Sequence, residues 1–477
     1  MYFIVGGLAW GAVIEVSPGD DLESLTETLS AGDEIVLADG LYTADSLEWS
    51  GEGTQDAPII IRAAEGASPI VQIIANEDLT YDGTLVTISD ATWLQVEGLS
   101  FVGSDDWRET EDPYYGMGIS NSAHVSLTDV EIGQIPYTAL YLSGDNSEIL
   151  IERAHIHDTL GGSAISIGCG DASCWTSNTT ITNSWIHGIG GEYNYGIYLA
   201  PGSQGITVSD TILYDVEYGG VYYGSAELGL LNVFEGNAVW STGHHGLVLQ
   251  GSSRARNNLI FNVDGSGIYT SDPEWDTFSD IVVSFNTVVN TEEWGVTLYD
   301  WYDQSGMVFA NNAICNPNGY GATYEEPEED TGVPPSENML SSNVICGLVS
   351  GLDSVAGHFV AGAGFTDFMD VEGWNFYPTS DSLLLNAADP SGEAWIPDID
   401  FNGLERDGGS PDVGAYEWFG GTNPGWSVQE GLKEFAVLEP EVEELVGGCC
   451  SSSESKESAI LLIPLLGFGL SRRRRQR

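Results

Sequence analysis

The sequence predicts an all-β protein folded as a right-handed parallel β-helix, a solenoid with an N-terminal cap and a C-terminal sorting tail. Between residues 84 and 316 a unit of about 21 to 32 residues recurs, combining a short glycine-led apolar strand with strands of alternating polarity. Helical patterns are almost absent. One such coil cannot bury its apolar face alone, so we expect the coils to stack, in the right-handed sense that crossover connections favour.

The short apolar strands are expected to form one continuous parallel sheet. They begin at Gly118, Ala139, Ala164, Gly196, Gly220, Gly246, Gly267 and Gly295. Asparagines and aspartates recur beside the alternating strands. Before these strands lie Asp129, Asn183, Asp210, Asn237, Asn258, Asn286 and Asn312, and after them lie Asp158, Asp215, Asn262, Asn290 and Asn316. Stacked identical side chains can hydrogen-bond from coil to coil, so both sets are interpreted as structural ladders.

The remaining segments are assigned by composition. Residues 1–12 are apolar without a basic start and are interpreted as a signal-peptide remnant. We expect the cap and first coils in residues 13–83, the central β-helix in 84–316, the last coils and a closing motif in 317–419, a linker in 420–447 and a sorting signal in 448–477.

The charge balance excludes nucleic acid as a partner. The chain has 72 acidic and 13 basic residues, a formal net charge of -59, and phosphate binding needs cations. Salt or calcium would screen the self-repulsion, so calcium is the cofactor that this surface would bind. Hydrophobic residues make up 42% of the chain, which argues against a disordered acidic protein. We expect a monomer.

The last thirty residues predict the compartment. Gly448, Cys449 and Cys450 precede a polar stretch, an apolar run from Ala459 to Leu470, and a cluster formed by Arg472, Arg473, Arg474 and Arg475. The apolar run is shorter than the ~20 residues that span a bilayer, so it is interpreted as a processed or transient membrane anchor. Basic clusters stay on the cytoplasmic side, which places the rest of the chain outside the cell. A plain tail anchor is the alternative.

Four other cysteines fall into two local pairs. Outside the cell, Cys169 with Cys174 and Cys315 with Cys346 are expected to form disulfides. Each bond requires the two Cα atoms to lie within ~7 Å. No Cys-x-x-Cys spacing predicts a zinc site.

Three segments resemble known families. Ala38 to Tyr42 and Pro58 to Ala63 look like the opening of β-helix polysaccharide lyases of the chondroitinase B and alginate lyase type, which implies a capping helix over Leu22 to Leu29. Asp398 to Arg406 and Pro411 to Glu417 are similar to the closing motif of choice-of-anchor Q surface proteins. The tail resembles the C-terminal sorting signals of myxobacteria. These lyases use a lysine and an arginine, often with calcium, but the coils contain no lysine, which argues against lyase activity of that type.

Histidines and aromatic residues are the candidate functional groups. His157 and His187 share a predicted column with Tyr214, Trp240 and Phe261, and His244 and His245 precede a glycine-led strand. These four histidines are the candidate catalytic residues, because imidazoles serve as general acids and bases. The predicted sugar-binding residues are Tyr198, Tyr214, Tyr222, Trp240, Arg254 and Arg256, within a wall that also includes Tyr141 and Tyr269. Asp215, Glu217 and Glu227 are weaker candidates for a glycosidase acid pair.

Two functions follow from this reading. The first is a secreted or cell-surface β-helix that binds or processes polysaccharide, as a lyase, epimerase or hydrolase. The alternative is a non-catalytic surface adhesin or spacer. Fold alone does not decide function, and the sequence leaves the reaction open.

Overall fold

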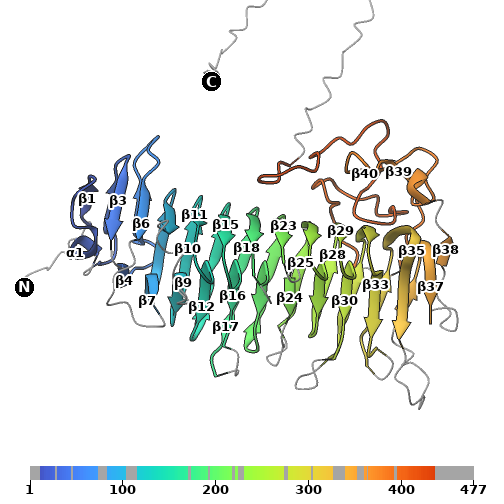
Figure 1. Ribbon diagram of the computed structural model, residues 1–477, viewed down its shortest axis with the longest axis horizontal. Coiled ribbons are helices and arrows are strands. Elements are labelled where there is room, and N and C mark those ends of the chain that lie inside the picture. The colour runs from blue at the N-terminus through green and yellow to red at the C-terminus, as the bar shows by residue number, and fades with distance from the viewer. Residues whose placement is uncertain are drawn as a thin grey trace, which may run out of the picture. The chain divides into compact units, whose positions relative to one another are not determined.

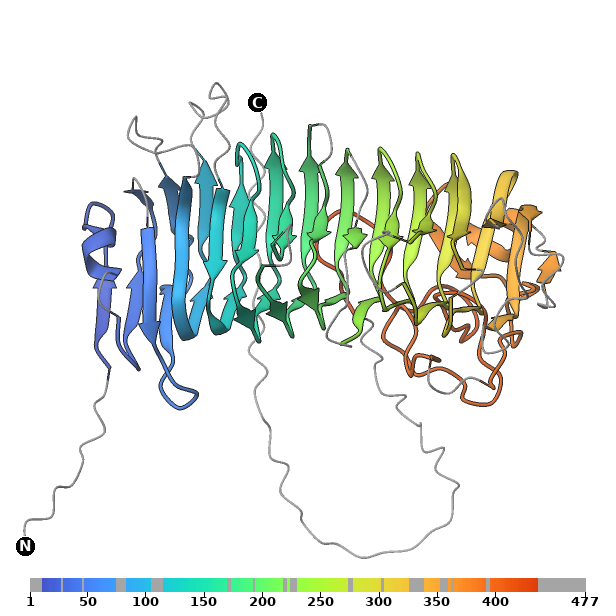
Figure 2. The same cartoon turned by 90° about the horizontal axis from the view of Figure 1, so that it is seen from below.

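The computed structural model describes residues 11–26, 29–44, 47–73, 83–103, 115–169, 173–191, 194–217, 221–223, 230–272, 278–301, 304–325, 339–351, 359–361, 364–391 and 395–435. The signal segment before residue 11, Glu227 and the whole sorting signal lie outside these residues. The described part confirms the predicted right-handed parallel β-helix, whose coils follow one another along Figures 1 and 2. Within it, no helix has the length and apolarity that a membrane crossing needs.

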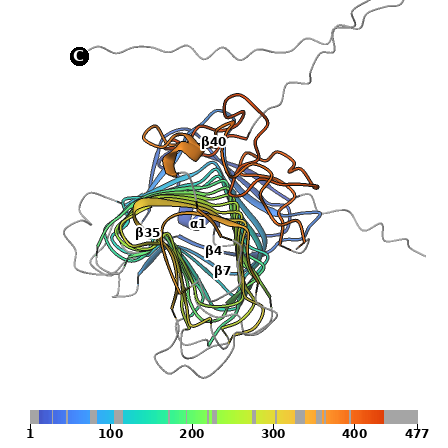
Figure 3. The same ribbon diagram turned by 90° about the vertical axis from the view of Figure 1, so that its right-hand side faces the viewer.

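Three parallel sheets form the sides of the solenoid, as the end view in Figure 3 shows. Sheet 1 contains the glycine-led strands. It consists of β4 (Leu47–Glu52), the start of β7 (Thr84–Glu97), β9 (Tyr115–Ser120), β12 (Leu140–Ser143), β16 (Ile165–Ile167), β20 (Ile197–Leu199), β24 (Val221–Tyr223), β27 (Leu247–Leu249), β30 (Ile268–Thr270), β33 (Trp294–Tyr299) and the ends of β35 (Ala313–Glu325) and β37 (Asn343–Ser350). The predicted continuous sheet is confirmed.

Sheet 2 follows sheet 1 in each coil. It consists of β1 (Val13–Val16), β2 (Glu34–Leu37), β5 (Ile59–Ala63), the end of β7, β10 (Ala123–Thr128), β14 (Leu150–Glu152), β18 (Thr180–Thr182), β22 (Thr207–Ser209), β25 (Asn232–Glu235), β28 (Ser253–Arg256), β31 (Ile281–Ser284), β34 (Val308–Ala310) and β36 (Met339–Ser341). The short strands β13 (Asn146–Ser147), β17 (Thr176–Ser177) and β21 (Ser203–Gln204) line the corner before it. The capping helix α1 is shorter than expected and spans Leu22–Thr26.

Sheet 3 completes each coil. It consists of β3 (Leu41–Ala44), β6 (Ile70–Ile73), β8 (Ser100–Gly103), β11 (Glu131–Gly133), β15 (His155–Thr159), β19 (Trp185–Ile189), β23 (Ile212–Val216), β26 (Ala238–Thr242), β29 (Leu259–Val263), β32 (Thr287–Thr291), the starts of β35 and β37, and β38 (Phe359–Ala361). Its inward positions stack in register, for example Ile156 on Ile186 on Leu213, and all three are buried. Burying each such side chain stabilises the fold by roughly 1.5–3 kcal/mol.

A buried asparagine ladder runs through the corner between sheets 2 and 3. Each side-chain Nδ2 donates to the Oδ1 of the next asparagine, over 2.8 to 3.0 Å. The members are Asn237, Asn258, Asn286, Asn312 and Asn343. The prediction was right for the first four and missed Asn343. It was wrong for Asn183, Asp129 and Asp210, which precede the ladder position and adopt φ values of 45° to 54°. Asparagine and aspartate tolerate this left-handed conformation better than most residues.

The residues predicted to follow the alternating strands also occupy turns, and most of them do not form a hydrogen-bonded ladder. Asp158, Asp215, Asn262 and Asn290 have φ values of 52° to 55°, and only the last two are joined, by a hydrogen bond of 2.6 Å. Asn316 lies outside this column, because it is buried and donates to the Thr291 carbonyl.

Both predicted disulfides are confirmed. Cys169 and Cys174 have Cα atoms 5.7 Å apart, and Cys315 and Cys346 have Cα atoms 4.6 Å apart. The second bond joins residues that are directly paired in neighbouring coils of sheet 3. It therefore links two coils, whereas the first closes a loop within one coil.

Residues 364–435 fold back over the outer face of sheet 3, above β29 and β35 in Figure 1. This C-terminal segment contains the 3-10 helix η3 (Gly364–Asp367) and the hairpin of β39 (Phe368–Asp370) and β40 (Asn375–Pro378). Within the closing motif, Arg406 is buried and donates to Asn257 of the solenoid over 2.8 Å.

The linker expected from residue 420 onward is wrong for its described part. Trp426 and Lys433 are 3% and 2% exposed. The Lys433 ammonium donates to Asp210 over 2.7 Å and to the Gly236 carbonyl over 2.8 Å, and it lies over the Phe401 ring. The composition of this segment predicted a linker, because composition does not show contacts with residues far away in the sequence.

Candidate functional site

Tyrosines line the outer face of sheet 1. Tyr141, Ser166, Tyr198 and Tyr222 are successive partners in register, and Tyr269 continues the same column. The strand period of two turns the side chains of Tyr141, Tyr198 and Tyr269 outward, while the leucines and isoleucines beside them are buried. The outward direction predicted for these three is therefore confirmed, and that of Tyr222 lies outside the described side chains.

Around Tyr141 and Tyr198 the face is hollowed into a cavity of about 370 Å³, here called the tyrosine groove. It is lined by Tyr115, Tyr137, Thr138, Tyr141, Gly162, Ser163, Ser166, Gly168, Asn194, Tyr195, Tyr198 and Ala200. Tyr115 stacks on Tyr141 and Tyr195 on Tyr198, each with ring centroids 5.1 Å apart. None of these described lining residues carries a formal charge at neutral pH. The groove thus presents aromatic faces beside neutral hydrogen-bonding groups.

A second hollow of about 340 Å³ lies further along the same sheet. Its lining includes Tyr269, Trp294 and Tyr320, together with Glu292 and Glu293. The Trp294 and Tyr320 rings are 4.5 Å apart. Sheet 1 therefore carries two aromatic hollows on one outer face.

The outer face of sheet 3 carries the histidine cluster, defined as Glu131, His155, His157 and His187. His157 Nε2 lies 3.1 Å from Glu131 Oε1, and His155 Nε2 lies 3.0 Å from His187 Nε2. The predicted pairing of His157 with His187 in one column is correct. Gly133 makes room for this arrangement, because a Cβ atom on it would lie 2.6 Å from His157 Nε2.

The cluster holds its groups in different charge states. The hydrogen bond from His157 lowers the pKa of Glu131 to about 2. Burial opposes the charged form of His157, but hydrogen bonds to Glu131 and Asp158 outweigh it and raise the pKa of His157. Burial, with the neighbouring imidazoles, lowers the pKa of His155 to about 4 and also lowers the pKa of His187. At neutral pH His155 is therefore an uncharged imidazole beside a carboxylate.

The aromatic column beyond the cluster is not an open sugar-binding surface. His187, Tyr214, Trp240 and Phe261 stack in order, as predicted, with centroids 4.7 to 5.5 Å apart. Trp240 is only 2% exposed and Phe261 is fully buried, because Trp374 and other residues of the C-terminal segment cover them. The prediction of an exposed column is wrong for Trp240, whose burial removes the stacking face. Tyr214 is half-buried between His187 and Trp240.

The other predicted residues lie apart from the cluster. His245 is stacked on Tyr269 at 4.5 Å, accepts a hydrogen bond from the Ser266 amide, and has its pKa lowered by burial to about 4. His244 packs edge-on against it. Arg254 and Arg256 share one face of β28, as expected, but that face belongs to sheet 2. Arg256 is paired with Glu235 at 2.8 Å. The predicted groups are thus spread over all three sheets.

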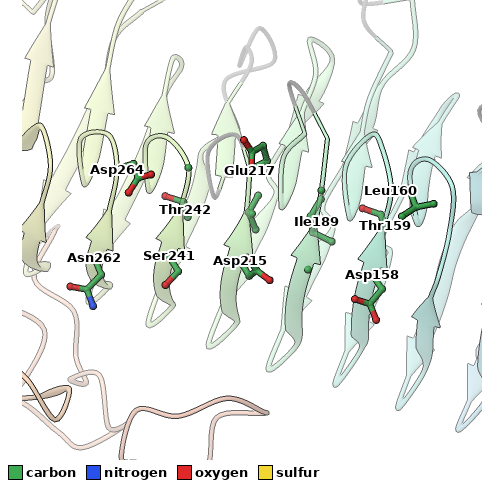
Figure 4. A pocket seen from close by; sticks show the side chains of 14 residues that line it. Asp158, Thr159, Leu160, Ile189, Asp215, Glu217, Ser241, Thr242, Asn262 and Asp264 are labelled. Carbon is green, nitrogen blue, oxygen red and sulfur yellow. The ribbon is translucent and has the colours of Figure 1, made fainter. Parts of the chain in front are cut away.

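An acidic groove of about 620 Å³ follows the corner between sheets 3 and 1. Figure 4 shows Asp158, Asp215 and Asn262 in one row on every second coil, with Ser241 between the last two and Glu217 and Asp264 beside the row. Carboxylates are the ligands that calcium takes, so calcium binding here stays a prediction. Within the described residues, the ligand atoms that do converge within 4.8 Å of one another belong to Glu131, His155 and His157.

Comparisons with known proteins agree with this architecture. The family described as right handed beta helix region matches residues 115–273 and 174–345, and the family described as chondroitinase B matches residues 16–101. The second match confirms the resemblance at the N-terminal end. No protein with a curated description matches the chain.

Solved structures share the fold at low sequence identity. Pectate lyase Pel9A is 15% identical, with a TM-score of 0.54 over 86% of this chain and 97% of that one. A mutant of the PL6 family alginate lyase AlyGC is 15% identical, with a TM-score of 0.51 over 82% of this chain and 59% of that one. The A-module of mannuronan C-5 epimerase AlgE6 from Azotobacter vinelandii is 13% identical, with a TM-score of 0.50 over 70% and 88%. The chain is a right-handed parallel β-helix.

Some residues of these sites were not predicted from the sequence. Glu131 was missed because acidic residues are so common in this chain that one more carries no signal. Tyr115 begins β9, and Tyr137 and Tyr195 precede β12 and β20, so none of them belongs to the glycine-led strand pattern used for the prediction. The only available signal was a tyrosine one or two residues before some of these strands, as at Tyr137 and Tyr195.

Proposed function

We propose that the protein binds polysaccharide along the outer face of sheet 1, with the tyrosine groove as the principal binding site. The observation that carries this proposal is the set of tyrosine rings around one elongated hollow, with hydroxyl, amide and backbone groups between them. Aromatic faces pack against the C–H faces of sugar rings, and neutral polar groups bind their hydroxyls. The two hollows on one sheet match a ligand that is itself a chain.

The charge of the groove defines the class of sugar. Among the described lining residues of this strongly acidic protein, a uronate polymer would meet no basic side chain to neutralise its carboxylates. We therefore propose a neutral polysaccharide. The solved relatives are described as acting on pectate, alginate and mannuronan, which supports a polysaccharide partner. The histidine cluster lies on sheet 3, and His245 stacks on Tyr269 outside the described lining of the groove, which favours binding over turnover at this site.

The location is proposed to be extracellular. Two disulfides are typical of oxidising compartments, and the sorting-signal resemblance of the tail agrees with display at a bacterial surface.

The test is retention on a panel of immobilised neutral and acidic polysaccharides. Tyr198→Ala should weaken binding of the retained neutral glycan by about 2- to 10-fold, the value of one aromatic contact of ~0.5–1.5 kcal/mol. Phe419→Ala is the matched control, because Phe419 is 53% exposed and belongs to the C-terminal segment instead of sheet 1. Equal retention of both variants would contradict the groove assignment.

The same panel distinguishes binding from turnover. Release of reducing ends or unsaturated uronates by the wild-type protein would identify an enzyme, and binding without either product would identify a lectin-like protein. If turnover occurs and His187→Ala abolishes it while retaining binding, the histidine cluster performs proton transfer, which is worth ~10²–10⁴ in rate.

A further inference from the structure

The histidine cluster is assembled from three successive coils. Glu131 comes from β11, His155 and His157 come from β15, and His187 comes from β19. Strands in a sheet are about 4.8 Å apart, so outward side chains at paired positions bring their polar ends together. His155 pairs with Glu131 in register, and His157 pairs with His187.

The ligand atoms of Glu131, His155 and His157 all lie within 4.8 Å of one another. Zinc binds nitrogen and oxygen at about 2.0–2.2 Å, which puts two ligands of a tetrahedral ion about 3.3 Å apart. The contact of 3.1 Å between His157 Nε2 and Glu131 Oε1 is close to that separation. Glu131 and His157 therefore need little movement to share one ion, whereas the His155 ring must also turn from its stack on His157, with ring centroids 4.2 Å apart.

The surrounding contacts are those that orient metal ligands. His157 Nδ1 faces the Asp158 carboxylate at 3.0 Å, which leaves Nε2 directed at the cluster. The second oxygen of Glu131 accepts a hydrogen bond of 2.7 Å from Ser100. His155 lies flat on Trp185, with centroids 4.0 Å apart. The Asp158 carboxylate thus orients His157 and raises the basicity of its imidazole, and the Ser100 hydroxyl orients Glu131; losing one such contact costs about 10- to 100-fold in metal affinity.

The placement of two carboxylates around His157 favours a cation. His157 has a carboxylate at each ring nitrogen, so a proton or a metal ion must lie between Nε2 and Glu131. The side chains of His157 and Glu131 are 12% and 38% exposed, so an ion from solvent can reach them. The net charge of -59 raises the local cation concentration.

We propose that Glu131, His155 and His157 form a binding site for a divalent transition-metal ion of the zinc type, with the fourth position open to water or to His187. Imidazole nitrogens select such ions over calcium and magnesium, which prefer oxygen ligands. The ion would tie β11 to β15. This site is independent of the tyrosine groove and of the proposed glycan binding.

The test is calorimetric titration of metal-free full-length protein with zinc chloride in buffer containing millimolar calcium. Calcium occupies sites made only of carboxylates, so the residual zinc binding reports nitrogen or thiolate ligands, and Cys449 and Cys450 are therefore replaced by serine in every protein tested. The wild type should bind one zinc ion, and His155→Ala should lose that binding. Glu131→Gln, which keeps the side-chain shape, should weaken binding more than the ~10- to 100-fold expected for an outer contact. Gly133→Ala should weaken it without removing a ligand.

His124→Ala is the matched control, because His124 is an outward histidine stacked on Trp93 at 4.0 Å and lies outside the cluster. It should bind zinc as the wild type does. Copper substitution adds a readout that does not depend on affinity: electron paramagnetic resonance should show two coupled imidazole nitrogens in the wild type and one in His157→Ala. Circular dichroism of the metal-free variants checks their folding. Absence of zinc binding by the wild type in calcium buffer, or unchanged binding by Glu131→Gln and His155→Ala, would overturn the proposal.

Discussion

Asparagine 286 is the central member of the buried ladder, and replacing it with alanine should destabilise the solenoid strongly. Its Nδ2 donates to the Ala255 carbonyl over 2.8 Å and to Asn312 Oδ1 over 3.0 Å. Its Oδ1 accepts from the backbone amide and the side-chain amide of Asn258, over 3.1 and 2.9 Å. Alanine leaves the Asn258 amide and the Ala255 carbonyl without these partners in a buried corner.

The expected cost follows from these two groups. An unsatisfied buried polar group costs ~1–3 kcal/mol, so with two such groups Asn286→Ala should lower the free energy of unfolding by about 2–6 kcal/mol. Asn286→Thr should lose less, because Thr211 occupies the same column three coils earlier and presents its hydroxyl oxygen to the Ser184 amide at 3.5 Å. Equilibrium urea unfolding, followed by circular dichroism at fixed salt, gives both values.

Asn290→Ala is the matched control, since Asn290 is exposed at a turn and outside the ladder. Its left-handed backbone makes alanine cost about 1–2 kcal/mol. If Asn286→Ala lowers the free energy of unfolding no more than Asn290→Ala does, the hydrogen bonds of the ladder do not stabilise the fold and the reasoning is refuted.

Three further outcomes are expected. Burial lowers the pKa of His245 from 6.5 to about 4, so the unfolded state takes up the proton at a higher pH than the folded state. The free energy of unfolding should therefore fall by up to about 3 kcal/mol as the pH drops from 6.5 to 4. His245→Asn should flatten this part of a plot of melting temperature against pH, and an unchanged slope would contradict the prediction. Lys433→Met should leave Asp210 without its partner and let protease cut the C-terminal segment faster, while equal cleavage of variant and wild type would show that the contact does not hold the segment. Transfer to low salt with a chelator should lower the melting temperature, because the acidic surface repels itself; no change would show that the charge has no effect on stability.

Local repetition made the solenoid predictable. The period of glycine-led strands, the inward isoleucines and the ladder from Asn237 to Asn312 are all repeated at coil spacing, so sequence distance translates directly into spatial contact. The disulfide between Cys315 and Cys346 was predictable for the same reason, because its cysteines are one coil apart.

Contacts between distant segments were not predictable. The burial of Trp240 depends on Trp374, more than a hundred residues later in the chain. The repeat pattern contains no signal that the C-terminal segment folds back over sheet 3. The histidine column was predicted from its spacing, but Glu131 became a partner only through the coil register. The tyrosine groove needed corner residues whose direction the strand pattern does not define.

The contact of Lys433 with Asp210 has a mechanical consequence. The described chain ends at Phe435, two residues after a lysine that is held at the middle of the solenoid rather than at its last coil. A force that pulls on the residues beyond 435 would first act on this ammonium and on the closing motif around Arg406. It would be directed across the solenoid axis, so it would not unfold the coils one after another from one end. Both ends of the solenoid would then be spared the load, and the first event under tension would be release of the C-terminal segment, which would expose Trp240 and Phe261.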